Sequence, residues 1–197
     1  MSDLPLQPRS PPAPPAWRRA VILLALLALV LALGVLAPAR RPQPQLLLDG
    51  PEDAWHYARA AQQLIDRAER RVWLAMYVVR PDDGPVRALL AALAAAARRG
   101  VEVRVALDRS ALREGEAEPK HEAAVAWLQQ HGIAVLLDDE RTTAHAKVLV
   151  VDGRWVLAGS HNWTYSALAR NRELSWLVDD PATAARVEDW LRRWTGW

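Results

Sequence analysis

The chain of 197 residues has no cysteine and no phenylalanine, and it has only two lysines, Lys120 and Lys147, and two asparagines, Asn162 and Asn171. The absence of cysteine excludes disulfides, thiolate metal ligands and a cysteine nucleophile. Arginine supplies the other 23 positively charged side chains. Lys147 and Asn162 nevertheless occur within the single stretch 142–168 (TTAHAKVLVVDGRWVLAGSHNWTYSAL), and Asn171 follows it closely. This concentration of rare residues indicates a chemical requirement in that stretch.

Strong positive charge is missing from most of the chain. Residues 1–43 hold five arginines and one aspartate, whereas residues 44–197 hold 20 basic and 22 acidic residues, a net charge of −2. Proteins that bind nucleic acids usually carry a marked excess of positive charge on the binding face. The total charge of residues 44–197 does not favour that function, although a local basic patch is left open.

The N-terminal residues divide into two predicted segments ahead of a linker. Residues 1–19 are rich in proline, which predicts a disordered leader. Residues 20–37 carry no charge, and as a helix they would reach roughly 27 Å, close to the hydrocarbon core of a bilayer at about 30 Å. We expect residues 20–39 to be a membrane anchor with the following domain outside the cytoplasm, in the periplasm or at the cell surface. A cleaved signal peptide, ending near Ala37-Pro38-Ala39, is the alternative and would make the domain secreted.

After a short linker at residues 40–45, the pattern of residues 46–197 alternates between strands and helices. Alternation of this kind predicts one layered α/β domain. Asp152-Gly153 between two apolar runs predicts a tight β-hairpin. The expected strands are 45–48, 71–79, 101–108, 133–137, 146–151, 154–159 and 173–178, and the expected helices are 52–70, 85–100, 121–131, 163–169 and 182–194.

His145 and Lys147 are two residues apart on a predicted strand, so both side chains leave the same face of that strand. Asp152 is seven residues from His145 and lies at the predicted hairpin turn. The odd spacing points its side chain away from His145, and we assign Asp152 a structural role in holding the turn or an ion pair.

The segment Gly159-Ser160-His161-Asn162 follows the hairpin. Gly159 permits a close backbone approach or an unusual φ angle, Ser160 and Asn162 offer polar side chains, and the backbone N–H groups ahead of the next helix are expected to be exposed. With the compact ammonium of Lys147, these groups suit a tetrahedral anion such as phosphate.

The residues HAKVLVVDGRWVLAGSHN fit the pattern H-x-K-x(4)-D-x(6)-G-S-x-N, which resembles the motif of the phospholipase D superfamily at every fixed position. Glu173, eleven residues after Asn162, stands where this family often has a carboxylate. The resemblance covers most of residues 46–195. It implies a layered α/β/α domain with a mixed central sheet.

By this resemblance, His145 would attack phosphorus and form a phosphohistidine, while Lys147 and Asn162, assisted by Ser160, would hold the nonbridging oxygens. Glu173 would fix the tautomer of the His145 ring. The resemblance implies no metal and no cofactor.

The proposed chemistry needs a second histidine to protonate the leaving group, and the chain has one motif. The resemblance implies a homodimer in which two copies share one cleft. His121 or His161 of the same chain is the alternative acid.

These features predict a membrane-associated or exported phosphodiesterase. The predicted anchor slightly favours phospholipid as the substrate, and a DNA or RNA endonuclease is the second possibility. A scaffold that binds phosphate groups without catalysis is the third.

Overall fold

The computed structural model describes residues 17, 21–26, 43–81, 84–109, 121–139 and 141–197. The chain separates into two compact units, Met1–Arg40 and Arg41–Trp197. In the first unit, residues 17 and 21–26 are described and are helical. No helix within the described residues has the length and hydropathy needed to cross a membrane. The predicted leader, most of the predicted membrane segment 20–39 and the start of the linker lie outside the described residues.

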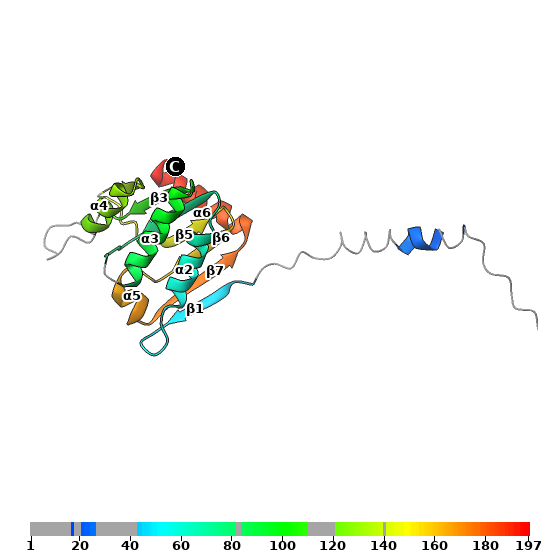
Figure 1. Ribbon diagram of the computed structural model, residues 1–197, viewed down its shortest axis with the longest axis horizontal. Coiled ribbons are helices and arrows are strands. Elements are labelled where there is room, and N and C mark those ends of the chain that lie inside the picture. Colours follow the sequence, from blue (N-terminus) through cyan, green and yellow to red (C-terminus); the bar gives the residue numbers. More distant parts are fainter. Residues whose placement is uncertain (1–16, 18–20, 27–42, 82–83, 110–120, 140) are drawn as a thin grey trace, which may run out of the picture. The chain divides into compact units, whose positions relative to one another are not determined.

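The second unit is built on one sheet of seven strands in the order β1-β7-β6-β5-β2-β3-β4 (Figure 1). The pairs β2/β3 and β3/β4 are parallel, and the other neighbours are antiparallel. The predicted mixed sheet is therefore confirmed. The strands are β1 (Gln45–Asp49), β2 (Arg71–Met76), β3 (Glu102–Leu107), β4 (Ala134–Leu137), β5 (Lys147–Val151), β6 (Trp155–Gly159) and β7 (Glu173–Asp179).

Alternate residues of a strand point to opposite faces of the sheet. Apolar side chains occupy both faces here, and helices cover each of them. In β2, Val72, Leu74 and Met76 join the larger core, which α2, α3 and α4 complete, whereas Trp73 and Ala75 join a smaller core under α6. Figure 1 shows α2 and α3 on one side of the strands. The helices are α2 (His56–Arg67), α3 (Pro85–Arg98), α4 (Glu122–Gln130), α5 (Tyr165–Ala169) and α6 (Pro181–Thr195).

Helix α2 begins later than the sequence predicts, at His56 and not at Glu52. The carboxylate of Asp49 accepts hydrogen bonds from the backbone N–H groups of His56 (2.8 Å) and Tyr57 (2.9 Å). These are two of the donors that a helix leaves unpaired at its start. The partner lies seven residues earlier, on β1, and so no local capping pattern marks the helix start.

One end of the sheet gathers the residues of the predicted site. Met76, the last residue of β2, pairs with Lys147, the first of β5. Asp49 at the end of β1 pairs with Glu173 at the start of β7, and Gly159 at the end of β6 pairs with Ser175. The sheet therefore brings the motif residues to one end of its strands, although they are up to 28 positions apart in sequence.

The opposite end of the hairpin is held by Asp152. Asp152 and Gly153 have φ angles of 56° and 64°, left-handed values that an Asp-Gly pair adopts readily in a tight turn, and Arg154 N donates to the Val151 carbonyl oxygen at 3.0 Å. The Asp152 carboxylate accepts hydrogen bonds from the backbone N–H groups of Glu69 (3.0 Å), Arg70 (2.8 Å) and Arg71 (3.0 Å), which ties the hairpin to the loop before β2. Partial burial acts to raise the pKa of Asp152, but these donors and the charge of Arg70 outweigh it and lower the pKa.

We expect Asp152→Ala to lower the free energy of unfolding by about 1–2 kcal/mol, because it leaves backbone donors without their acceptor. Asp152→Asn, which keeps one acceptor and tolerates positive φ, should cost less. A carboxyl group with a lowered pKa stabilises the fold above its unfolded-state pKa, and that contribution disappears as the pH falls through the folded-state pKa. Urea unfolding should therefore show the gap between wild type and Asp152→Asn closing in acid; a gap independent of pH would contradict this role.

Gly159 is required by the close approach of β7. A Cβ atom at this position would lie 2.2 Å from Ser175 Oγ and 2.3 Å from the Leu174 carbonyl oxygen. The φ angle of Gly159 is not positive. The glycine is therefore needed for the close approach of β7 and not for an unusual backbone conformation.

Gly159→Ala should therefore separate β6 from β7 and cost about 1–3 kcal/mol of stability or more. Gly50→Ala is the matched control, because a Cβ atom there meets only Glu52 Oε2 at an ordinary 3.8 Å. Thermal unfolding of the two variants, followed by circular dichroism, tests the difference. Equal melting temperatures would show that β7 does not limit position 159.

Candidate functional site

His145 and Lys147 lie together at the edge where the strand ends meet. His145 is exposed and lies two residues before Lys147, the first residue of β5, whereas Lys147 is only 8% exposed. The Lys147 ammonium is 3.4 Å from Nε2 and 3.5 Å from Nδ1 of His145, and it donates to the His145 carbonyl oxygen at 3.1 Å. An accessible imidazole thus stands beside a fixed positive charge.

Tyr77 completes this group and was missed in the sequence. Its ring centroid is 4.3 Å from that of His145, and Lys147 Nζ is 4.8 Å from the Tyr77 ring centroid. The tyrosine follows β2 directly, and β2 is the antiparallel neighbour of β5. The pairing of β2 with β5 joins segments that are far apart in the sequence. No local sequence pattern therefore predicts that Tyr77 lies at the site.

The pKa of Lys147 is lowered. Burial, which disfavours the charged ammonium, is the main cause, and the negative charges of Glu173 and Asp108 partly oppose it. The lysine therefore gives up its proton at a lower pH than an exposed lysine does. Any function that needs its charge has an alkaline limit set by this residue.

Glu173 is not placed as expected. No hydrogen bond joins it to the His145 ring within the described part of the chain. Its carboxylate instead accepts hydrogen bonds from the Ser160 hydroxyl and from Asn171 Nδ2, the latter at 3.0 Å. The physical reason is the strand order, since β6 lies between β5 and β7. The expectation that Glu173 fixes the His145 tautomer therefore lacks the contact that it requires.

The backbone N–H groups of the GSHN segment are also less available than expected. Ser160 N donates to the Leu174 carbonyl oxygen at 2.9 Å, and Trp163 N donates to the Val78 carbonyl oxygen at 3.0 Å. Helix α5 begins at Tyr165 with Thr164 as its cap, whose hydroxyl accepts from Ala167 N. Ser160 is held by both its backbone and its hydroxyl. The backbone N–H groups of His161 and Asn162 have no hydrogen-bond acceptor among the described residues.

Asn162 differs from its neighbours, because its side chain is not held by hydrogen bonds of its own. The Oδ1 position is buried and has no partner among the described residues. A half-turn about χ2 exchanges the oxygen and the NH₂ group of a carboxamide, so this position can present either a donor or an acceptor. A buried polar atom without a partner is rare and often marks a place that a ligand fills.

The two alternative acids within the chain are buried. His121 is 1% exposed, and its Nδ1 accepts from the backbone N–H of Val79 at 3.2 Å. His161 is 0% exposed, with both ring nitrogens engaged by Ser175 and Asp49. Neither ring is open to an ester from outside the protein, so both expectations are wrong for this arrangement. Among the described residues, no group of three or more His, Asp or Glu side chains could hold a metal ion.

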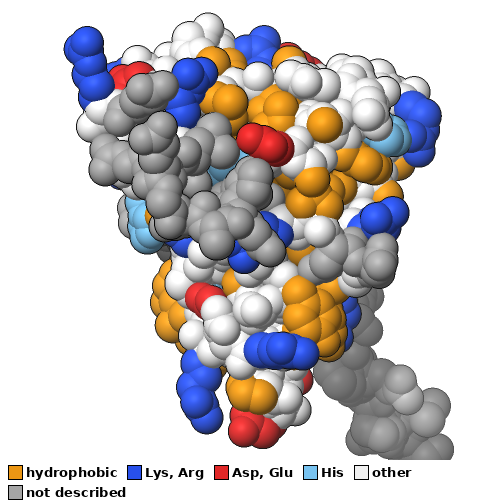
Figure 2. All heavy atoms as spheres, turned by 90° about the vertical axis from the view of Figure 1, so that its left-hand side faces the viewer, with side chains coloured by type: hydrophobic (Ala, Val, Ile, Leu, Met, Phe, Trp, Pro, Cys, Tyr) orange, Lys and Arg blue, Asp and Glu red, His pale blue; other side chains and the backbone are white. Residues whose placement is uncertain are grey.

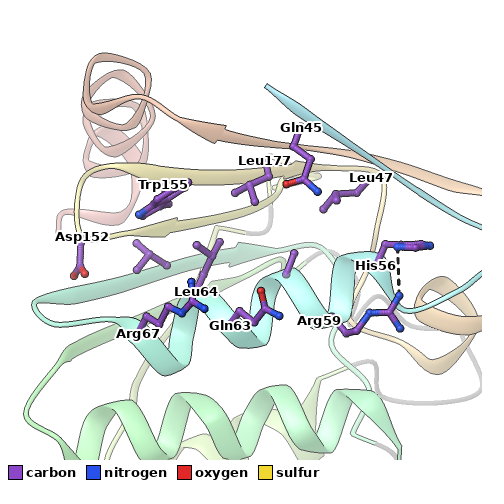
Figure 3. A pocket seen from close by; sticks show the side chains of 12 residues that line it. Gln45, Leu47, His56, Arg59, Gln63, Leu64, Arg67, Asp152, Trp155 and Leu177 are labelled. Carbon is purple, nitrogen blue, oxygen red and sulfur yellow. Dashed lines mark hydrogen bonds between the residues drawn. The ribbon is translucent and has the colours of Figure 1, made fainter. Parts of the chain in front are cut away.

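A hollow of about 290 Å³ opens next to His145. Trp190 and Trp194 of α6 form its apolar side, and Asp138, Asp139 and Thr142 form part of its polar side. A larger hollow of about 420 Å³ lies elsewhere, between α2 and the strands β1, β5, β6 and β7, and Figure 3 shows Arg59, Gln63 and Arg67 along its helical wall. This hollow contains none of the predicted site residues apart from Asp152. A third hollow, of about 510 Å³, is lined by Ser160 and Glu173.

The surface on the side of α4 and α5 carries mixed chemistry. Figure 2 shows Lys and Arg side chains interspersed with apolar and acidic ones there, and no continuous basic face outside the grey atoms. This side matters because α5 begins at Tyr165, three residues after Asn162. The local basic patch that the sequence left open is not visible on this side.

Comparison with known proteins identifies the family. Residues 62–195 match the family model described as cardiolipin synthase, PLD-like domain. The chain is 37% identical over 131 residues to a phospholipase D of Rickettsia felis, covering 66% of this chain and 60% of that protein. It is 30% identical over 158 residues to the mitochondrial cardiolipin hydrolase of Xenopus laevis, covering 80% and 70%.

Solved structures agree with this match. The fold superposes with a TM-score of 0.62 on Nuc, a phospholipase D family member from Salmonella typhimurium, at 26% identity over 77% of this chain and 94% of Nuc. NucT from Helicobacter pylori gives the same TM-score at 19% identity, which shows likeness of fold alone. The match spans 60% of the length of the Rickettsia felis relative. On the family match and the shared fold, the chain belongs to the PLD-like domain family of the phospholipase D superfamily.

Proposed function

We propose that this protein is a metal-independent phosphodiesterase that works through a phosphohistidine on His145. The observation that carries the proposal is the exposed His145 imidazole, which has the Lys147 ammonium group 3.4 Å from its Nε2 at the end of the sheet where β5 begins. A neutral imidazole nitrogen is a good nucleophile toward phosphorus, and a nearby fixed cation stabilises the charge that develops on the nonbridging oxygens.

In the first step, a lone pair of the His145 ring forms a bond to phosphorus, and the bond from phosphorus to the leaving oxygen breaks. A proton from an acid converts that oxygen to an alcohol. Water then attacks the phosphohistidine and gives a proton to the residue that acted as the acid in the first step, and the bond from phosphorus to the imidazole breaks as the new bond to oxygen forms. Lys147 holds a nonbridging oxygen throughout, and the free Asn162 carboxamide holds another. Tyr77 limits the rotation of the His145 ring.

The acid is supplied by a second copy of the chain, because His121 and His161 are buried. Exposed apolar side chains on the sheet support this proposal: Leu46, Leu48, Leu174 and Trp176 are each more than 40% exposed. They form two cross-strand pairs, Leu46 with Trp176 and Leu48 with Leu174, and β1 is an edge strand. An apolar patch next to Glu173 suits a two-fold contact that brings two His145 rings into one cleft.

Phospholipid is the substrate class that we favour. The relatives carry the names phospholipase D and mitochondrial cardiolipin hydrolase, and residues 44–197 have a net charge of −2, which does not favour polyanionic nucleic acid. The likeness to Nuc keeps DNA or RNA cleavage as the second candidate. A membrane anchor at residues 20–39, with the domain outside the cytoplasm, would place the site at a lipid surface and remains a prediction.

Substrate class is tested by incubating the full chain, in detergent micelles and EDTA, with phosphatidylglycerol, cardiolipin, single-stranded DNA and RNA. Cleavage of the lipids alone supports the first candidate, and cleavage of the nucleic acids alone supports the second. If wild type and His145→Ala are equally silent on all four, the phosphate-binding scaffold remains. A strict requirement for a divalent metal would contradict the proposed chemistry.

His145→Ala should reduce hydrolysis of bis(p-nitrophenyl) phosphate by roughly 10³-fold or more, because it removes the nucleophile. His131→Ala is the matched control, since that exposed ring lies at the end of α4 and stacks on Trp127, not on a residue of the motif. Rapid quenching in alkali followed by mass spectrometry should find a phosphoryl group on residue 145 of the wild type. Its presence on another residue would refute the assigned nucleophile.

The pH profile should fall on the alkaline side as Lys147 loses its proton, at a lower pH than an exposed lysine would give. The sign follows from burial, which lowers the pKa of Lys147, and from the need for its charge. Lys147→Arg stays charged throughout this range and should have lower activity without the alkaline decline. An unchanged decline in Lys147→Arg would mean that another group causes it.

Trp176→Glu should convert a dimer into a monomer and abolish most activity, because it buries a charge in the proposed contact. Gln62→Glu on the exposed side of α2 adds the same charge elsewhere and should leave the dimer intact. Sedimentation equilibrium at several protein concentrations measures the association. A fully active monomer in either variant would rule out the shared cleft.

A further inference from the structure

Asn162 is the one proposed phosphate ligand whose side chain lacks hydrogen bonds of its own. Lys147, by contrast, is fixed by burial and by its bond to the His145 carbonyl oxygen. Something else must hold the Asn162 carboxamide in place if it is to bind an oxygen atom. Its two neighbours in sequence, His161 and Trp163, are both 0% exposed. The contacts of these two residues hold the backbone on either side of Asn162.

His161 sits at the variable position of the motif and is bonded at both ring nitrogens. Nδ1 lies 2.8 Å from Ser175 Oγ, and Nε2 lies 2.9 Å from Asp49 Oδ2. Burial lowers the pKa of His161, although the charges of Asp49 and Glu173 act to raise it. A neutral ring satisfies both contacts only if Nε2–H donates to Asp49 and Nδ1 accepts from the Ser175 hydroxyl.

The same aspartate also determines where α2 begins, because Asp49 accepts from the backbone N–H groups of His56 and Tyr57. Tyr57 then contacts both neighbours of Asn162. Its ring stacks on His161 with centroids 4.5 Å apart and planes 14° apart, and its hydroxyl accepts from Trp163 Nε1 at 3.2 Å. The segment around Asn162 is thus fixed to β1, to α2 and to β7.

Such a set of buried polar groups is expensive to desolvate, and an apolar replacement of similar volume is often equally stable. A network in which every polar group is bonded fixes its residues in one arrangement. Here, the fixed residues lie on both sides of Asn162, whose own amide has no hydrogen-bond partner among the described residues. Ser175 also lies where a Cβ atom of residue 159 would be, so it limits the start of the same turn.

We propose that Asp49, Tyr57, His161 and Ser175 form a buried positioning network that orients the Asn162 carboxamide toward the substrate phosphate. The proposal rests on the proposed function for its chemical purpose, but the positioning itself is independent of catalysis. None of the four residues contacts the substrate; each acts through the backbone on either side of Asn162.

The scarcity of asparagine makes a direct test possible. The full chain, labelled with ¹⁵N only in asparagine and held in detergent micelles, has two side-chain NH₂ groups, those of Asn162 and Asn171. Asn171 donates to Glu173 and serves as the internal control. Ser175→Ala and Tyr57→Phe each remove one hydroxyl from the network, and Thr195→Val removes a hydroxyl bond at the far end of α6 as the matched control.

We expect one sharp pair of NH₂ signals for Asn162 in the wild type and in Thr195→Val. In Ser175→Ala and Tyr57→Phe, this pair should broaden or double while the Asn171 pair stays unchanged. With bis(p-nitrophenyl) phosphate, the kcat of these two variants should fall about tenfold with little change in KM, because misplacement of a ligand affects the reacting geometry most. His161→Gln, which offers one donor and one acceptor, should retain more activity than His161→Leu.

The outcomes separate the two claims. If Ser175→Ala and Tyr57→Phe leave the Asn162 signals and kcat unchanged, the four residues are ordinary core and the positioning network is refuted. If the Asn162 signals broaden as expected but the wild type hydrolyses no phosphodiester, the network stands and the proposed function fails. Loss of the Asn171 signals together with those of Asn162 would indicate general unfolding and would also count against a specific network.

Discussion

The register of the β5/β6 hairpin is the constraint on which the site depends. Val151 pairs with Trp155 and Val148 with Ala158, so one further step along the same ladder sets Lys147 opposite Gly159. Both ends of the motif therefore meet at the edge of the sheet because the hairpin arms are equal in length. The tight turn at Asp152 fixes this register, and the bonds from Asp152 to the loop before β2 hold the hairpin against its other neighbour.

The sheet then builds two unlike halves around the motif. His145, Lys147 and Tyr77 lie on the β5/β2 side, where the imidazole is exposed and the ammonium is partly desolvated. The GSHN segment lies on the β6/β7 side, where the side chains of Ser160 and His161 are hydrogen-bonded and that of Asn162 is not. Reactive groups and rigid supports are thus separated by one strand spacing. This division lets a small domain hold an accessible imidazole next to a close-packed end of the sheet.

Local patterns in the sequence were sufficient for the elements and for part of the site. The Asp-Gly turn, the apolar strand runs and the two-residue spacing of His145 and Lys147 are short-range features, and the structure has each of them. The start of α2, the contacts of Tyr77 and the partners of Glu173 depend on which strands are neighbours. Glu173 was expected to reach His145, but strand order sets it beside Ser160. The role of His161 was missed for the same reason, since Asp49 is 112 residues away.

The hairpin also makes the motif sensitive to length. Side chains on a strand alternate between faces, so one residue added between Lys147 and Asp152 would turn His145 and Lys147 toward α6 or shift them past Gly159. Insertions and deletions are tolerated in loops that only connect elements, but here the number of residues is itself part of the site. The number of residues between Lys147 and Asp152 determines where the lysine lies relative to Gly159. That number matters as much as the identity of the two residues.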